Sequence, residues 1–188
     1  MRDSALLGLR LTLGGYLAVH GAQKLFGSFD GPGLDKTGVG FARLGLKPGK
    51  AFAALAGGSE FAGGILTAIG AAYPVGPLAI AGAMAVASLT HADKGLMLQK
   101  GGFELPASNL AAAIVLIGTG PGRYSLDRLI GLRLLKGLTR LTVLGAAALT
   151  AYSAVQVVKT KRRAARAQSA PAATATTEAA QAQAQASA

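Results

Sequence analysis

The sequence predicts an all-α membrane protein, a four-helix transmembrane bundle followed by a fifth, C-terminal transmembrane helix. Of its 188 residues, 51% are hydrophobic and 14% are charged, whereas a soluble domain is about 25% charged. The apolar residues form five blocks, most of them close to the roughly 17 to 25 residues that a helix needs to cross a bilayer. Segments rich in glycine, proline and charge separate these blocks, as expected for loops.

The composition also excludes several classes of function. The chain has no cysteine, which rules out a disulfide framework, a thiolate zinc site, an iron-sulfur cluster and a catalytic thiol. Any redox chemistry therefore needs an electron carrier from another molecule. The net charge is +11, but the basic residues lie mostly in loops and in the tail, as the positive-inside rule for membrane proteins places them. We therefore expect membrane lipids as partners and no nucleic acid.

The first half of the chain predicts two spans and a long connection. The first span covers residues 5–26. Residues 27–50 are rich in glycine, proline and charge and predict a loop, with one short interfacial helix around residues 39–44. The second span covers residues 51–72 and ends at a turn over residues 73–77, where two prolines bracket a glycine.

The second half predicts three more helical segments and a tail. The third span covers residues 77–90 and the fourth residues 105–120, joined by a structured loop that dips against the membrane. Residues 123–137 have leucines at spacings of three and four with arginines between them, the pattern of an amphipathic helix on a lipid surface. The predicted divisions are a membrane domain (1–128), an amphipathic linker (129–137), a fifth span (138–158) and a basic, then low-complexity disordered tail (159–188).

Charge counting favours one orientation in the membrane. Eleven lysines and arginines lie in residues 27–50, 91–106 and 159–166, against five on the other side. The positive-inside rule then places the N-terminus outside and the C-terminus in the cytoplasm, provided that the fifth segment spans.

Small residues at four-residue spacing predict the helix contacts, because membrane helices associate through close backbone approach. The predicted stripes are Gly14, Ala18 and Ala22 in the first span, Ala54, Gly58 and Ala62 in the second, with Gly57 and Gly64 beside them, and Ala79, Ala83 and Ala87 in the third.

Charged residues inside the spans are the strongest functional signal. Glu60 lies in the middle of the second span, and a charge there costs about 2.5 to 3.5 kcal/mol unless it has a partner. Arg10, His20 and Lys24 share one side of the first span. The helical rise places His20 nearest in depth to Glu60, while Arg10 or Lys24 could reach it by extending. The pair is either functional or an ion pair that locks the first two spans together.

A second polar group flanks Gly101 and Gly102 at a predicted membrane interface. It consists of His91, Asp93, Lys94 and Glu104. Nothing in their spacing fixes a coordination geometry, so we expect no metal site. The group is interpreted as a substrate-binding or structural loop that anchors at the level of the lipid headgroups.

Several of these segments, in this order, resemble the DoxX family of small integral membrane proteins. The matching motifs are His20 to Gly27 (HGAQKLFG), Gly31-Pro32-Gly33, Leu44-Gly45-Leu46, Gly58 to Gly64 (GSEFAGG), His91 with Lys94-Gly95, Gly101 to Glu104 (GGFE) and Gly120 to Asp127 (GPGRYSLD). The resemblance covers about residues 5–128. The segments after Asp127 depart from the family pattern and look like additions.

The resemblance implies a multi-pass protein of the bacterial cytoplasmic membrane, related to DoxD-like subunits of thiosulfate:quinone oxidoreductases. The positions that it marks are Arg10, His20, Lys24, Glu60, His91 and Glu104. Four-helix relatives usually keep both ends inside, which conflicts with the charge count given above.

Two functions remain open from the sequence. In the first, the chain is a redox-associated subunit that binds a quinone or another small molecule between the first and second spans. Glu60 would then accept the proton, His20 would hydrogen-bond a carbonyl, and Arg10 or Lys24 would stabilise the developing charge. In the second, the chain is a non-enzymatic anchor or scaffold for a partner complex. A partner redox subunit and a second copy of the chain are both expected as candidate partners.

Overall fold

The computed structural model describes residues 1–132 and 136–169, which contain helices and no strand. The helices are α1 (Arg2–Phe26), α2 (Gly33–Arg43), α3 (Gly49–Ile69), α4 (Val75–His91), η1 (Ala92–Lys94), η2 (Leu98–Lys100), α5 (Glu104–Thr119), α6 (Leu126–Ile130) and α7 (Lys136–Ser169). The predicted all-α class is confirmed. The four predicted spans of the bundle correspond to α1, α3, α4 and α5, with ends that agree to within three residues.

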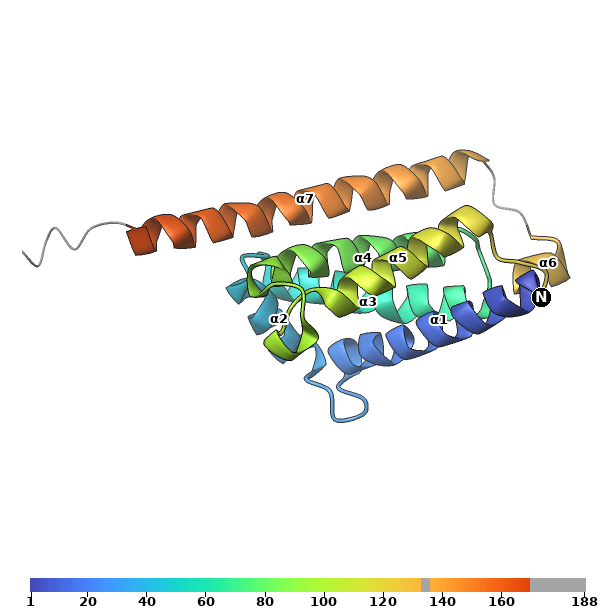
Figure 1. Ribbon diagram of the computed structural model, residues 1–188, viewed down its shortest axis with the longest axis horizontal. Helices are drawn as coiled ribbons and strands as arrows, with labels where there is room; N and C mark the ends of the chain where they lie inside the picture. Colours follow the sequence, from blue (N-terminus) through green and yellow to red (C-terminus); the bar gives the residue numbers. More distant parts are fainter. Residues whose placement is uncertain (133–135, 170–188) are drawn as a thin grey trace, which may run out of the picture.

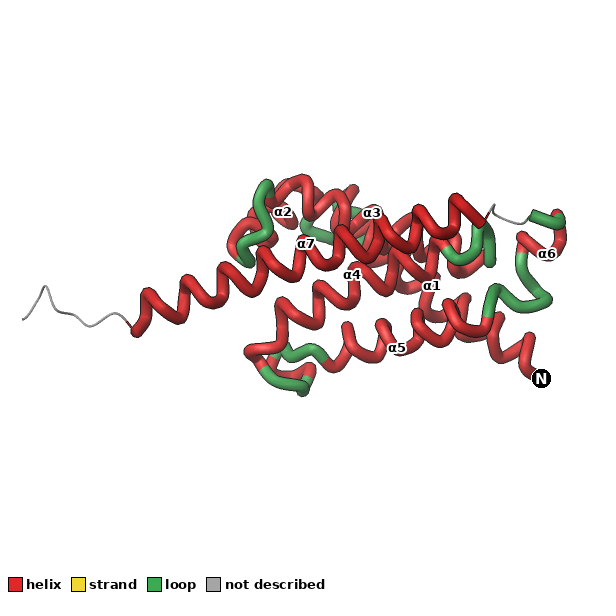
Figure 2. Tube along the Cα trace, turned by 90° about the horizontal axis from the view of Figure 1, so that it is seen from above, coloured by secondary structure: helices red, strands yellow, loops and turns green. Residues whose placement is uncertain are grey.

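The long helices lie side by side and form a bundle with two distinct ends (Figure 1). The N-terminus and α6 lie at one end, which we call the α6 end. Helix α2, the two 3-10 turns and the last turns of α7 lie at the other, the α2 end. Seen from above, α7 runs along α4, with α2 and α3 on one side and α5 on the other (Figure 2). The N-terminus and the end of α7 therefore lie at opposite ends of the bundle (Figure 1). The charge count given above assumed this arrangement.

Three helical segments of the described chain are long and apolar enough to cross a membrane, namely Gly49–Ile69, Val75–Lys94 and Thr139–Ala167. Helix α5 is apolar but shorter, and α1 has 25 residues but carries Arg10, His20 and Lys24. Many outward side chains are large and apolar, among them Ile114 and Leu144, which are 56% and 68% exposed. Such helices favour contact with lipid, so the chain is a multi-pass membrane protein.

Helices α1 and α3 contact each other backbone to backbone. A Cβ atom added to Gly14 would lie 2.5 Å from the carbonyl oxygen of Gly64, and one added to Gly64 would lie 2.6 Å from that of Gly14. A Cβ atom on Gly21 would overlap the backbone of Gly57 and Phe61. The contact thus depends on glycines at two levels, two helical turns apart.

The predicted stripe of small residues on the second span is wrong. Gly58 has open space around its Cα atom, and Ala62 is exposed. The seam uses Gly57 and Gly64, which the prediction placed beside this stripe. They are seven residues apart and so share a face at about 100° per residue. On α1 the predicted Gly14 and Ala18 do face α3, because a Cβ atom on Gly64 would contact Ala18.

The predicted amphipathic helix over residues 123–137 is also wrong. The structure has the five-residue α6, which ends at Gly131 in the left-handed conformation (φ 67°). Residues 133–135 lie outside the described residues. Helix α7 continues through the basic cluster of residues 159–166 to Ser169, where a span ending at residue 158 was predicted. The low-complexity tail over residues 170–188 lies outside the described residues.

Helix α7 packs against the bundle along its length. Val157 is 1% exposed and packs with Leu46 and Phe52, while Tyr152 stacks on the ring of Phe52 at 6.0 Å between centroids. The Lys161 ammonium donates to the carbonyl oxygens at the C-terminus of α4. We therefore describe α7 as a fifth helix of the bundle.

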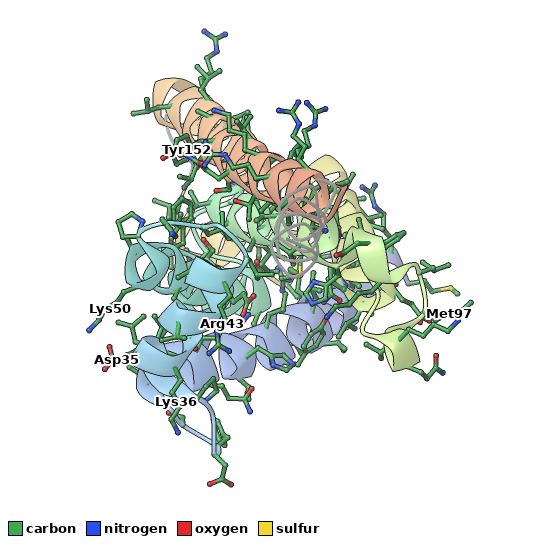
Figure 3. All side chains as sticks on the ribbon, turned by 90° about the vertical axis from the view of Figure 1, so that its left-hand side faces the viewer. Asp35, Lys36, Arg43, Lys50, Met97 and Tyr152 are labelled. Atoms are coloured by element: carbon green, nitrogen blue, oxygen red, sulfur yellow. The ribbon has the colours of Figure 1, made fainter. Side chains whose placement is uncertain are left out.

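The α2 end carries most of the charge. Seen end-on, α2 and the start of α3 present Asp35, Lys36 and Lys50 on one side, and the segment before η2 presents Met97 on the other (Figure 3). Lys50 pairs with Asp35 at 2.7 Å, with both side chains exposed. Such an exposed pair contributes little stability. Met97 is 53% exposed, and the predicted dip of its loop against the membrane stays a prediction.

Candidate functional site

The centre of the candidate site is an ion pair between α1 and α3. The Lys24 ammonium donates to both carboxylate oxygens of Glu60. Glu60 is 3% exposed, whereas 29% of the Lys24 side chain is accessible. Because a buried carboxylate without a partner is strongly unfavourable, the pairing with Lys24 stabilises Glu60 in this position.

The expected partner of Glu60, His20, turns away from it. The His20 ring is exposed, with its Nδ1 atom 3.1 Å from the Gln23 side-chain oxygen and its edge on Tyr16. The small residues Gly14, Ala18 and Gly21 set which side of α1 faces α3, and His20 lies about 130° from the centre of that stripe. The helical rise placed His20 at the depth of Glu60. The rotation of α1 about its axis, however, directs Lys24 and not His20 toward Glu60.

Arg10 lies at the other end of α1, about 21 Å along the helix from Lys24. It is 2% exposed, and its guanidinium donates to the backbone carbonyl oxygens of Pro121 and Tyr124. The expected role of Arg10 as a second cation near Glu60 does not agree with this position. Arg10 instead fixes the segment between α5 and α6.

Asp127 completes this arrangement at the α6 end. Its two carboxylate oxygens accept hydrogen bonds from the backbone amides of Ala72 and Tyr73, both at 2.8 Å. Its own amide donates to the carbonyl oxygen of Gly70 at 3.1 Å. Asp127 is the last residue of the GPGRYSLD motif, but nothing in its local sequence indicated that it binds the backbone of the α3–α4 turn.

The largest apolar cavity near the ion pair lies between α3, α4 and α7. Its volume is about 380 Å³, and Lys24 lies in its wall. We call it the α7 cavity. Its other lining side chains include Phe52, Ala56, Ser59, Val86, Ala87, His91, Leu149 and Ser153. This cavity does not coincide with the predicted slot between the first and second spans, where glycines bring the backbones of α1 and α3 into contact.

A second cavity of about 260 Å³ lies on the other side of Lys24. It reaches from Tyr16 and His20 to the loop with Gly101 and Gly102, and we call it the loop cavity. Lys24, Ala87 and His91 line both cavities. The ammonium that holds Glu60 therefore stands between an apolar space and a space that leads to the α2 end.

Tyr16 and Asn109, which the sequence interpretation did not single out, connect α1 with α5 in the loop cavity. The Tyr16 hydroxyl donates to the Asn109 side-chain oxygen, and the Asn109 amide lies 3.7 Å from the Met84 sulfur. Asn109 is 6% exposed. An asparagine in an otherwise apolar segment was the signal that could have marked it.

The residues of the predicted polar loop contact different partners. His91 Nδ1 lies 2.8 Å from the Ala87 carbonyl oxygen, which leaves its Nε2 atom for a ligand. A Glu104 oxygen accepts from the Leu98 amide at 3.0 Å, and Asp93 pairs with Lys161 at 2.8 Å. Lys94 is exposed beside Gly101. Within residues 1–132 and 136–169, no three metal-binding side chains come together.

A comparison with known protein families finds a match over the segment that contains the Lys24–Glu60 ion pair. The model of the DoxX family matches residues 5–93. No curated protein and no solved structure matches the chain significantly. The matched segment runs from α1 to η1 and contains Arg10, His20, Lys24, Glu60 and His91. Residues 5–93 are therefore similar to the DoxX family, and α5, α6 and α7 follow the matched segment in the chain.

Proposed function

We propose that this protein is a redox-associated membrane subunit that binds a quinone, or a small apolar molecule with a similar polar head, in the α7 cavity. One observation carries the proposal: Lys24, which pairs with the buried Glu60, lines an apolar cavity between membrane helices. Ligand sites of this kind are mostly apolar, with a few polar groups that fix orientation.

The cavity fits such a molecule in size and in chemistry. Its volume of about 380 Å³ lies in the range of small-molecule sites, roughly 300 to 1,000 Å³. Two of its hydroxyl groups are already used, because Thr150 and Ser153 donate to backbone carbonyls one turn earlier. Lys24 and His91 are then the polar side chains best placed to bind a carbonyl oxygen of the ligand.

The residues of the chain have distinct roles in this proposal. Lys24 donates a hydrogen bond to a ligand carbonyl oxygen, and His91 Nε2 orients the ligand from α4. Glu60 pairs with the Lys24 ammonium and can accept a proton when Lys24 shifts toward the ligand. A bound quinone supplies the capacity to accept two electrons and two protons. With no cysteine in the chain, the electrons come from a partner redox subunit.

The geometry of the ion pair also favours a second candidate function. Lys24 donates to both Glu60 oxygens, so the pair is satisfied without a ligand. In this alternative the protein is a non-enzymatic anchor or scaffold for a partner complex or for a second copy of itself. The ion pair and the α1–α3 glycine contact then serve only to make the bundle rigid.

The first experiment measures quinones that co-purify with the detergent-extracted protein, by mass spectrometry of a lipid extract. Ala56→Phe places a ring in the α7 cavity, and its matched control Ala62→Phe changes an outward position on the same helix. If the added ring makes quinone binding ~1.4 kcal/mol less favourable, the amount of quinone retained falls about tenfold. We expect the wild type and Ala62→Phe to retain quinone, and Ala56→Phe and Lys24→Met to lose it.

The opposite outcomes are equally informative. If all variants are folded and none, including the wild type, retains a quinone, the scaffold function is favoured. If Ala56→Phe retains as much quinone as Ala62→Phe, the ligand binds elsewhere and the α7 cavity is not the site.

A further inference from the structure

Three arginines line one groove at the α6 end, far from the Lys24–Glu60 pair. The groove has a volume of about 1090 Å³ and lies between the start of α1, the α5–α6 segment and the first turns of α7. Its basic residues are Arg2, Arg123 and Arg128, all exposed. We call it the arginine groove.

The two acids in the groove, Asp3 and Asp127, form no ion pair with these arginines. Asp3 accepts a hydrogen bond from the Arg123 backbone amide at 2.9 Å, and both Asp127 oxygens are used by backbone amides of the α3–α4 turn. The ion pairs in the described part of the chain lie elsewhere. The three guanidinium groups therefore face the groove without a carboxylate partner among the described residues.

The backbone that carries two of the arginines is held in place. Arg10 donates to the carbonyl oxygens on both sides of Arg123. The Ser125 hydroxyl donates to the Gly122 carbonyl oxygen at 2.8 Å and accepts from the Arg128 amide at 3.3 Å. A site whose backbone is fixed before binding loses less entropy when a ligand arrives.

The surroundings of the groove are apolar. Leu6, Ile117 and Val143 contribute to its lining, and α6 beside it presents Leu129 and Ile130, which are 82% and 61% exposed. Adjacent leucine and isoleucine at a helix end are typical of a segment that lies at the membrane interface. A ligand with both phosphate and acyl chains matches the groove and its apolar border.

We propose that the arginine groove binds the phosphate headgroup of an anionic phospholipid, with the acyl chains along Leu6, Val143 and α6. Arginine suits this role because its planar guanidinium pairs bidentately with phosphate. The site is independent of the quinone proposal, since no residue of the groove lines the α7 cavity.

The test uses the full chain in detergent and native mass spectrometry with added phosphatidylglycerol, phosphatidylcholine or inorganic phosphate. At roughly 1 kcal/mol for each basic residue, Arg123→Gln with Arg128→Gln weakens phosphatidylglycerol binding about 30-fold. The matched control, Arg162→Gln with Arg163→Gln, removes two charges at the α2 end and leaves this site unchanged. Arg2→Gln alone weakens phosphatidylglycerol binding about fivefold. This single variant replaces the double variant in the test if the double variant does not fold.

Three results overturn the proposal. The first is equal binding of phosphatidylcholine and phosphatidylglycerol by the wild type. The second is displacement of the lipid by inorganic phosphate at the same concentration, which identifies a site for free phosphate. The third is wild-type affinity for phosphatidylglycerol in both groove variants while the α2-end control loses it.

Discussion

Lys24 and Glu60 join α1 to α3 through both oxygens of a carboxylate that is 3% exposed. Removal of one partner leaves the other charge buried, at a cost of about 3 to 5 kcal/mol. We expect Lys24→Met or Glu60→Gln alone to lower the free energy of unfolding by up to this amount. We expect the loss for Glu60→Gln to lie near the lower end of this range. The Lys24 side chain is 29% exposed, so its ammonium can reach water when Glu60 is neutral.

The double variant Lys24→Met with Glu60→Gln separates the two functions of the pair. It removes both charges, so we expect most of the stability to return. Thermal unfolding in detergent measures the stability, and the quinone content measures the ligand. A stable double variant that has lost its quinone supports the ligand site. A stable double variant with unchanged quinone content contradicts the proposed role of Lys24.

The glycine contact between α1 and α3 predicts a sharp difference between two glycines. Gly21→Ala places a Cβ atom against the backbone of Gly57 and Phe61, so the helices must separate. Gly58→Ala meets open space and gains about 0.5 to 1 kcal/mol in helix propensity. We expect the first to lower the melting temperature by several degrees and the second to leave it equal or higher. Equal effects would contradict this packing.

The spans were predictable from the sequence because block length alone decides whether a helix can cross a bilayer. The partner of Glu60 was not predictable from the sequence, because the choice of partner depends on the rotation of α1 about its axis. That rotation follows from which glycines meet across α1 and α3, and the stripe of Ala54, Gly58 and Ala62 had the same spacing as a true seam. A single sequence does not distinguish a seam from an exposed stripe.

The α7 cavity was unpredictable for a similar reason. It exists because α7 packs on the bundle through the contacts of Val157 with Leu46 and Phe52 and through the Phe52–Tyr152 stack. These contacts are between residues more than ninety positions apart in the sequence. Of the charged positions predicted inside the spans, Arg10 and Glu60 are buried, Lys24 is partly accessible and His20 is exposed. Their roles as catalytic or binding residues stay predictions.

Lys161 predicts how α7 is held over the cavity. Its ammonium donates to the Leu89 and Thr90 carbonyl oxygens at 2.9 and 3.2 Å and to Asp93 at 2.8 Å. A cation at a helix C-terminus contributes about 0.3 to 1 kcal/mol. We expect Lys161→Met to increase hydrogen exchange in α7, with exposed Lys159→Met as the control. Equal exchange in both variants would show that Lys161 does not hold the helix.

Tyr73 predicts a loss of stability at high pH. Burial raises the pKa of Tyr73 above its ordinary value of 10.0, and its hydroxyl donates to the Ile117 carbonyl oxygen. In the unfolded chain Tyr73 ionises first, so the folded state loses stability as the pH rises above 10. We expect Tyr73→Phe to flatten this decrease in melting temperature. A decrease of the same slope in the variant would assign it to other groups.

The orientation of the bundle is the last prediction. Because the lysines and arginines concentrate at the α2 end, we propose that this end faces the cytoplasm of a bacterial cell. The chain has no cysteine, so single substitutions report their own accessibility. Ser4→Cys marks the α6 end and Lys100→Cys the α2 end, and both residues are exposed. In intact cells, we expect a membrane-impermeant thiol reagent to label Ser4→Cys and to spare Lys100→Cys until the cells are lysed. The reverse pattern would place the arginine groove on the cytoplasmic side and would show that the charge bias does not orient this protein.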